Sequence, residues 1–539
     1  MIRQRLADWV STPGGRRRAR DLGFLAVLFV FVGLAYGPSL KHPPRADQWC
    51  FLADTRCDHT FLDTLRHSYS YNRTRKIGPG DTDLFRPVLF ALLAAEKSAF
   101  EGRLAPPQAL GIAFHCAVCA LFLVLVRQIK GIVRPATEEA DDGPDWFTYA
   151  TVAFFALNPC VQELVIWHHL HGYLLFLLLL FGSMSCLLRY AADSDRGEPD
   201  ARYLWAAWGL ALVSAFTYEL GQIYAILAGA CAAFVAAPRV GTKRAVRIVA
   251  GFATIAVGYQ TLNRIDERVH RDTYEPENLR PLMLKAAPTR ATVVNTARYA
   301  TYTMVQPFFP SLVQTSCGGQ RLQVEESVWK GRRLKVLTPA LAVSFAVFGA
   351  GLVLGFAGLR RLTREPSRLR LVALALPVAL YAAYGAVTVL GRMNMRPYLP
   401  ILSSNSYYAY TALLFGLLAA SAGWHAVGGW GAPVRRWLAV GMLVSSALGA
   451  EYVREANVMV ARHEKEWARP LEAVQEFVDK HRHEPGFSFR VDYAASDDIP
   501  IIHMVPVVRL VFDEWMCGPD PRYRVTIRDG KAHGERLRE

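Results

Sequence analysis

The stretch Leu157–Tyr190 reads LNPCVQELVIWHHLHGYLLFLLLLFGSMSCLLRY, and its pattern decides the class of protein. Its first half gathers Gln162, Glu163 and three histidines. Its second half is a run of about eighteen mostly apolar residues, which is long enough to cross the hydrocarbon core of a bilayer. Ionisable groups at a membrane boundary cost free energy, so they are usually retained for function. The stretch predicts a membrane protein with a polar site at one face of the bilayer.

Apolar runs recur along the whole chain, which has 539 residues, 52% of them hydrophobic. Their lengths predict an all-α polytopic membrane protein with about eleven transmembrane helices. The expected spans are 23–40, 108–127, 147–159, 172–190, 203–218, 220–237, 246–262, 336–358, 371–390, 406–422 and 437–453. The run at 147–159 is short, and the two runs around Tyr218 are also compatible with one broken span.

Basic residues predict the orientation of these spans. Arg16, Arg17, Arg18 and Arg20 precede the first span, so we expect residues 1–22 to form a cytoplasmic N-terminus. The short loops expected on the same side are also rich in lysine and arginine, which explains much of the net charge of +15 without a nucleic-acid partner. An odd number of spans places the C-terminus outside.

Two domains follow the N-terminal segment in this topology. A transmembrane domain is expected over 23–453, with outer loops at 41–107 and 263–335, and a small external α/β domain over 454–539. In the first loop, DLFRPVLFALLAAEKSAFEG is too short and too charged to span, so we expect an amphipathic helix in the interface. In the C-terminal domain, a helix near 454–483 precedes strands at FSFRVDY and YRVTIRDG.

Asp47 is the candidate catalytic residue, because it follows the first span closely in RADQWCFLAD. A carboxylate just outside the membrane can act as a general base toward the acceptor of a lipid-linked substrate. The alternative is an ordinary solvated acid. The same loop also holds four rival acids, namely Asp54, Asp58, Asp81 and Asp83.

Four further residues are candidates for substrate binding. Arg86 precedes Pro87, and its planar guanidinium suits phosphate, although arginine at this depth also serves as an interfacial anchor. Glu219 lies between two apolar runs in SAFTYELGQIY, where an acid needs a partner. Arg392 and Arg396 flank a loop rich in tyrosine and serine that suits a pyrophosphate or sugar ligand, or headgroup anchoring.

Glu163, His168 and His171 form the densest polar cluster. The two histidines are three residues apart and share a helical face, which Glu163 joins if the segment is helical throughout. The H-H-x-H pattern admits a divalent metal, since imidazole is a common ligand of transition metals. The spacing matches no specific zinc pattern, so we assign no metal ligand and expect binding of a sugar or polar headgroup. His115, inside a span, is expected to hydrogen-bond a neighbouring helix.

The order of several motifs resembles a known superfamily. The motifs are DLFRPV, FEGRLAPPQALGIAFHCAVCALFLVLV, FFALNPCVQELVIWHHLHGYLLFLLLL, SAFTYELGQIYAILAGA and RMNMRPYLPILSSNSYYAYTALL. Together, over about residues 22–425, they resemble the membrane portion of the C-type (GT-C) glycosyltransferases. Among these, they are most similar to the tetratricopeptide-containing transmembrane O-mannosyltransferases and their bacterial relatives, without the repeats.

The resemblance implies a reaction and a place for it. Such enzymes take a sugar from a polyprenyl-phosphate donor and transfer it, on the non-cytoplasmic face, to an acceptor protein or glycan. For this chain it implies a bacterial inner-membrane location, with Asp47 as the base. Arg86, Glu163 and Glu219 would line the site.

Three departures from the family pattern keep other functions open. Asp47 is followed by Gln48 where paired acids are common, and Tyr218 replaces a lysine. His169-Leu170-His171 replaces an arginine-x-aspartate. A non-catalytic relative that serves as a scaffold or partner in an envelope complex is therefore the main alternative. The third possible function is a polymerase or ligase of lipid-linked glycans, which would rely on Arg392, Arg396 and His171.

Overall fold

The structure is a computed structural model of the whole chain. It describes residues 12–42, 60–66, 85–100, 105–134, 144–269, 349–361, 367–392, 407–427, 431–462, 464–491, 522–528 and 531–537, and a few single positions such as Met304 and Phe308.

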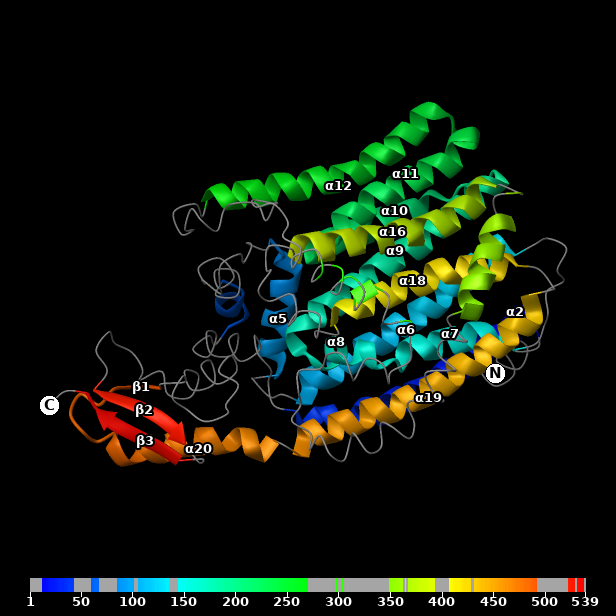
Figure 1. Cartoon of the computed structure of the whole chain (residues 1–539). Coiled ribbons are helices and arrows are strands. Elements are labelled where there is room, and N and C mark those ends of the chain that lie inside the picture. Colours follow the sequence, from blue (N-terminus) through cyan, green and yellow to red (C-terminus); the bar gives the residue numbers. More distant parts are fainter. Residues whose placement is uncertain are drawn as a thin grey trace, which may run out of the picture.

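Helices dominate the described residues, with a small sheet near the C-terminus (Figure 1). The helices are α2 (Pro13–Tyr36), η1 (Gly37–Lys41), α5 (Pro87–Phe100), α6 (Ala105–Val133), α7 (Trp146–Ala156), η2 (Pro159–Val161), α8 (Gln162–Ile166), η3 (His168–Leu170), α9 (His171–Arg196), α10 (Ala201–Thr217), α11 (Leu220–Val240), α12 (Thr242–Val269), α16 (Arg368–Arg392), α18 (Tyr407–Ala426), α19 (Ala432–Arg462) and α20 (Glu464–His481). The strands are β1 (Phe489–Val491), β2 (Tyr523–Arg528) and β3 (Lys531–Arg536).

Six helices of the described chain are long and apolar enough to cross a membrane, and a seventh span arises if α7 and the segment Pro159–Ile166, bent by 48°, count as one. The six are Gly15–Lys41, Pro106–Val133, His171–Arg196, Leu220–Val240, Thr242–Asp266 and Arg368–Val389. Each coincides with a predicted span, which supports a multi-pass membrane protein. The count of eleven stays a prediction, because the expected spans 203–218, 406–422 and 437–453 fall on helices outside these six. The span 336–358 is described only from residue 349.

The helices lie roughly side by side, with α6 and α9 in contact near the middle of the bundle (Figure 1). Helices α10, α11 and α12 pack on the α9 side, and α2 packs against α19 on the other. The two runs around Tyr218 form separate helices, because α10 ends at Thr217 and α11, which packs against it, starts at Leu220. The start of α2 and helix α5 lie at opposite ends of the bundle; we call the end that carries α5 the distal end and the other the N-terminal end.

Charged residues join the helices at the N-terminal end. Arg127 of α6 donates one hydrogen bond to Asp21 of α2 (2.6 Å) and another to Asp145 at the start of α7 (2.9 Å). Lys130 also contacts Asp145. Tyr149 donates to Asp21 (2.8 Å). These groups are partly buried, and burying an unpaired charge costs free energy. Each charge here has an opposite charge within hydrogen-bond distance, which offsets that cost.

The C-terminal residues form a small α/β unit that follows α19 through α20. Strand β1 pairs parallel with β2, and β2 pairs antiparallel with β3. One face of the sheet buries Phe489 and Val525 against Val474 and Phe477 of the amphipathic helix α20. The predicted strands at FSFRVDY and YRVTIRDG are therefore confirmed, whereas β3 was not predicted. The apolar segment between β1 and β2 lies outside the described residues.

His115 is the polar centre of the bundle interior. Its side chain is fully buried, and its Nε2–H donates to the carbonyl oxygen of Ala156 (2.9 Å). Its Nδ1 accepts from the hydroxyl of Tyr410 (2.9 Å). One imidazole thus links α6 to α7 and α18, which confirms the expectation that His115 bonds to neighbouring helices.

Replacing His115 with leucine should lower the thermal unfolding midpoint of the purified protein in detergent. Leucine fills similar volume but leaves Tyr410 and Ala156 without their partner, at a cost of about 1–2 kcal/mol for hydrogen bonds within a membrane. Val124→Ala is the matched control, because Val124 lies on the same helix with 43% of its surface exposed. Equal midpoints for the two variants would contradict the assigned role of His115.

Candidate functional site

Helix α5 lies at the distal end of the bundle, against α9, α10 and α6 (Figure 1). Its inner face buries Leu89 and Leu93. Gly172, at the start of α9, permits this approach, because a Cβ atom there would lie 2.1 Å from the Cδ1 of Leu89. A helix is therefore present where the first outer loop is expected to carry one, and its position in the membrane interface stays a prediction.

Arg86, directly before α5, forms a bidentate ion pair with Glu219. Its Nε donates to Oε1 and its Nη2 donates to Oε2, both at 2.9 Å. Glu219 lies in the tight turn between α10 and α11. Burial alone would lower the pKa of Arg86, but the adjacent Glu219 carboxylate raises it above its ordinary value, so the guanidinium stays charged.

Aromatic rings surround this ion pair. The guanidinium of Arg86 lies 3.9 Å from the ring centroid of Tyr218, a distance typical of a cation–π contact. Tyr173 of α9 packs edge-on against Tyr218 with centroids 4.5 Å apart. Tyr259 of α12 donates to the carbonyl oxygen of Phe85 (2.9 Å). Tyr218 thus contacts Arg86 directly.

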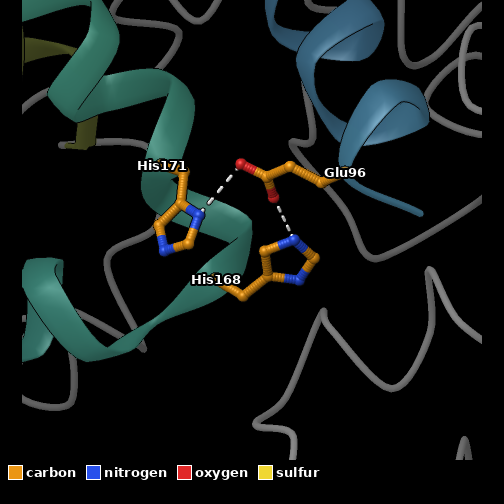
Figure 2. Close-up of side chains that lie close together, drawn as sticks. All are labelled: Glu96, His168 and His171. Carbon is orange, nitrogen blue, oxygen red and sulfur yellow. Dashed lines mark hydrogen bonds and ion pairs between the residues drawn. The ribbon is translucent and has the colours of Figure 1, made fainter. Parts of the chain in front are cut away.

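A second cluster joins the other end of α5 to the turn before α9. Figure 2 shows Glu96 between His168 and His171, with one carboxylate oxygen directed at each ring. His171 Nδ1 lies 3.1 Å from Oε1, and His168 Nε2 contacts Oε2. All three side chains are buried, with 3% of Glu96, 4% of His168 and none of His171 exposed. The cluster is therefore a polar site shielded from solvent.

The histidines keep Glu96 ionised. Burial alone would raise the pKa of Glu96, but the hydrogen bonds from His168 and His171 outweigh burial and lower the pKa to about 2. Burial lowers the pKa of His168, against the opposing effect of Glu96. A buried carboxylate with two imidazoles can hold a proton, a polar ligand or a cation.

A break in the helix separates Glu163 from the two histidines. Asn158 caps the turn η2, accepting a hydrogen bond from the backbone N–H of Cys160 (3.0 Å), and Trp167 adopts an extended conformation between α8 and η3. The segment is thus not helical throughout. Glu163 is half-buried in α8, and the acid that meets the histidines is Glu96. The sequence signal for Glu96 was its charge within an otherwise apolar stretch, which we had interpreted only as a feature of an interfacial helix.

The structure describes only some of the remaining candidate site residues. Asp47 and Arg396 lie outside the described residues, and so do Asp54, Asp58, Asp81 and Asp83. Arg392 ends α16, but its side chain is not described. The structure therefore brings Arg86 to Glu219 and His168 to His171, and it leaves the position of the proposed base as a prediction.

Asn457 of α19 connects other chain segments at the distal end. Its Nδ2 donates to the carbonyl oxygen of Ala35 (3.0 Å), and its Oδ1 accepts from Gln162 (2.8 Å). Its carbonyl oxygen accepts from His42 Nε2 (2.9 Å). These bonds hold the end of α2, the start of α8 and α19 together beside the histidine turn.

An apolar cavity of about 390 Å³ lies elsewhere, between the helical segment 349–361, α18 and the first half of α19. Phe154, Phe356 and Trp424 are among its walls, and its described lining contains no charged side chain. Arg435, which donates to the carbonyl oxygens of Trp424 and Val427, lies nearby at the N-terminal end of α19. The cavity suits a hydrocarbon chain and is distinct from the polar clusters at the distal end.

Replacing Gly111 with alanine should disturb the Glu96 cluster. A Cβ atom on Gly111 would lie 2.4 Å from the carbonyl oxygen of Val165 and 2.5 Å from Nε2 of His171. We expect a loss of about 1–3 kcal/mol of stability, as for other overpacked interiors, seen as a lower thermal midpoint. Gly131→Ala on the same helix has open space around it and should keep or raise the midpoint. Identical shifts would show that the contact with His171 is unimportant.

The Arg86–Glu219 pair should show energetic coupling in a double-mutant cycle with Arg86→Gln and Glu219→Gln. Because 37% of the Glu219 side chain is exposed, solvent screening should keep the coupling near 1 kcal/mol. The equivalent cycle on the exposed pair Arg202–Asp200 serves as the control and should give no measurable coupling. Denaturant unfolding of all variants measures both cycles, and equal values would refute a specific role for the first pair.

Comparison with known proteins gives limited information. No known protein family and no curated protein matches the chain. Among solved structures, the chain is similar to that in the crystal structure of ArnT from Cupriavidus metallidurans bound to undecaprenyl phosphate. The two chains are 12% identical, and the match covers 94% of this chain and 92% of that chain at a TM-score of 0.33. At this score the similarity carries no argument about function, so the function must be inferred from the chain's own residues.

Proposed function

We propose that this protein is a membrane glycosyltransferase of the GT-C type. It takes a sugar from a polyprenyl-phosphate donor and transfers it to an acceptor on the non-cytoplasmic face. The proposal rests on the order of family-like motifs along the sequence. It is supported by the contact between two residues that the resemblance assigns to one site.

That contact is the ion pair of Arg86 and Glu219, which lie 133 residues apart in the sequence. A guanidinium has five N–H donors, and Glu219 accepts from Nε and Nη2. Three donors remain, two on Nη1 and one on Nη2, to bind phosphate oxygens of the donor lipid. Glu219 and Tyr218 would then hold the guanidinium in a fixed orientation, which increases the affinity of a bidentate phosphate site.

In the proposed reaction, an acceptor hydroxyl attacks the anomeric carbon of the lipid-linked sugar. Asp47 takes the hydroxyl proton, and the bond between the sugar and the phosphate breaks. The leaving polyprenyl phosphate carries away the electron pair, and Arg86 stabilises the negative charge that develops on it. The donor itself supplies the energy of the transfer.

The alternative function is a non-catalytic scaffold in an envelope complex, and it gives the Arg86–Glu219 ion pair a purely structural role. If Arg86 and Glu219 only neutralise each other, the pair holds α5 in place and binds no phosphate. The external position proposed for the C-terminal α/β unit would then serve partner binding. The two functions differ in whether Asp47 matters.

Asp47→Asn should lower sugar transfer by about 10²–10⁴-fold, the usual contribution of a general base. The measurement is transfer of radiolabelled sugar from the lipid fraction to protein or glycan, in membrane vesicles with matched amounts of each variant. Asp54→Asn, in the same loop, is the control and should keep wild-type transfer. Thermal midpoints of both variants, measured alongside, distinguish a loss of transfer from a loss of folding.

Full activity of Asp47→Asn would remove Asp47 from the mechanism. A wild-type protein with no transfer, which co-purifies with stoichiometric partners, would favour the scaffold.

A further inference from the structure

We propose that Glu96, His168 and His171 bind a divalent transition-metal ion, with zinc as the representative, which fastens α5 to the turn before α9. This site is separate from the Arg86–Glu219 pair, and the inference does not depend on the proposed sugar transfer.

The spacing of the three side chains suits one ion. Each offers one ligand atom, and these atoms all lie within 4.8 Å of one another. Zinc binds imidazole nitrogen and carboxylate oxygen at about 2.0–2.2 Å, which places neighbouring ligands of a tetrahedral ion about 3.3 Å apart. Oε1 of Glu96 and Nδ1 of His171 are 3.1 Å apart. Modest side-chain rotations therefore bring all three atoms onto a common ion.

The chemistry of the ligands selects the class of ion. Calcium and magnesium prefer sites built from oxygen atoms. Two imidazoles and one carboxylate suit zinc and neighbouring transition metals, and this set of three protein ligands leaves one tetrahedral position for another ligand. A bound dication also supplies the opposite charge that a buried carboxylate such as Glu96 requires.

The surroundings of His171 provide an independent observation. Its Nε2 is buried and has no hydrogen-bond partner among the residues that the structure describes. If Nδ1 binds a metal, the ring proton resides on Nε2, and this N–H needs an acceptor. A Cβ atom on Gly111 would lie 2.5 Å from Nε2 of His171 and 2.4 Å from the carbonyl oxygen of Val165. Gly111 thus leaves room for the imidazole.

The site would act as a clip between distant segments. Glu96 lies on α5, whereas both histidines lie more than 70 residues later, on η3 and at the first position of α9. Since the same helix is tied through Arg86 at its other end, metal binding would hold α5 at both ends. A metal-free triad, in which each imidazole N–H donates to one carboxylate oxygen, is the competing arrangement, and it requires no cation.

Metal analysis of the full-length protein distinguishes the two. The protein is purified in detergent through a tag without histidines, loaded with zinc chloride and passed over a chelating resin. We expect about one zinc ion per wild-type chain and almost none for Glu96→Gln or His168→Asn. His483→Asn, which changes an exposed histidine in the C-terminal unit, is the control and should keep the metal. A wild-type chain without retained zinc, or equal retention by Glu96→Gln, would overturn the site.

Two further measurements test the site even if Glu96→Gln and His168→Asn fail to fold. The thermal midpoint of the wild type should fall after treatment with a strong chelator and recover with zinc; an unchanged midpoint argues for the metal-free triad. Cobalt loaded in place of zinc should give visible absorption typical of nitrogen and oxygen ligands. In His168→Cys, the spectrum should gain a thiolate-to-cobalt charge-transfer band. That band would place the ion at residue 168, and its absence in a folded, cobalt-loaded variant would place the ion elsewhere.

Discussion

A charged side chain that is withdrawn from water must meet an opposite charge or several hydrogen-bond donors, and this requirement fixes the position of α5. The helix carries a charge at each end. Arg86 meets Glu219 from the turn between α10 and α11, and Glu96 meets two histidines from the turn before α9. Because the partners are 133 and 72 residues away in sequence, these two contacts join α5 to two distant turns of the chain. Every functional interpretation of the distal end depends on them.

The distribution of polar groups along the bundle fits a chain that crosses a membrane. Ionic contacts gather at its two ends, with Asp21, Arg127 and Asp145 at the N-terminal end and the α5 clusters at the distal end. Between them, the described interior is mostly apolar, and the buried His115 is hydrogen-bonded through both ring nitrogens. Polar chemistry in this part of the protein is therefore concentrated where the helices end, and a substrate that carries both a lipid tail and a polar head could use both regions.

Much of this arrangement could be predicted from the sequence, because apolar length and charge placement are local signals. The spans at 23–40, 108–127 and 172–190 coincide with membrane-length helices. The suspicion that Glu219 needs a partner was correct, since an acid between two apolar runs must find one, but the sequence could not name Arg86 as that partner. Contacts between distant segments depend on how helices pack, and periodicity carries no such information.

The Glu96 cluster shows where this kind of inference stops. The two histidines were recognised by their spacing, but Glu163 was expected to join them on a continuous helix. The extended backbone at Trp167 breaks that helix, and the tertiary fold supplies Glu96 instead. The short strand β3 was missed for a related reason: its residues, KAHGER, lack the alternation of a half-buried strand, and its pairing with β2 makes it a strand.

The way α19 leaves the bundle has a mechanical consequence for the C-terminal unit. Asn457 fixes α19 to Ala35, His42 and Gln162 through three hydrogen bonds, and the helix continues for residues 458–462 before α20 begins at Glu464. The α/β unit therefore follows a helix that is itself fixed to the bundle at Asn457. A force on α19 would strain the attachment at Asn457, whose partner Gln162 opens the segment that leads to His168. Movement of α19 would in this way affect the polar turn at the distal end.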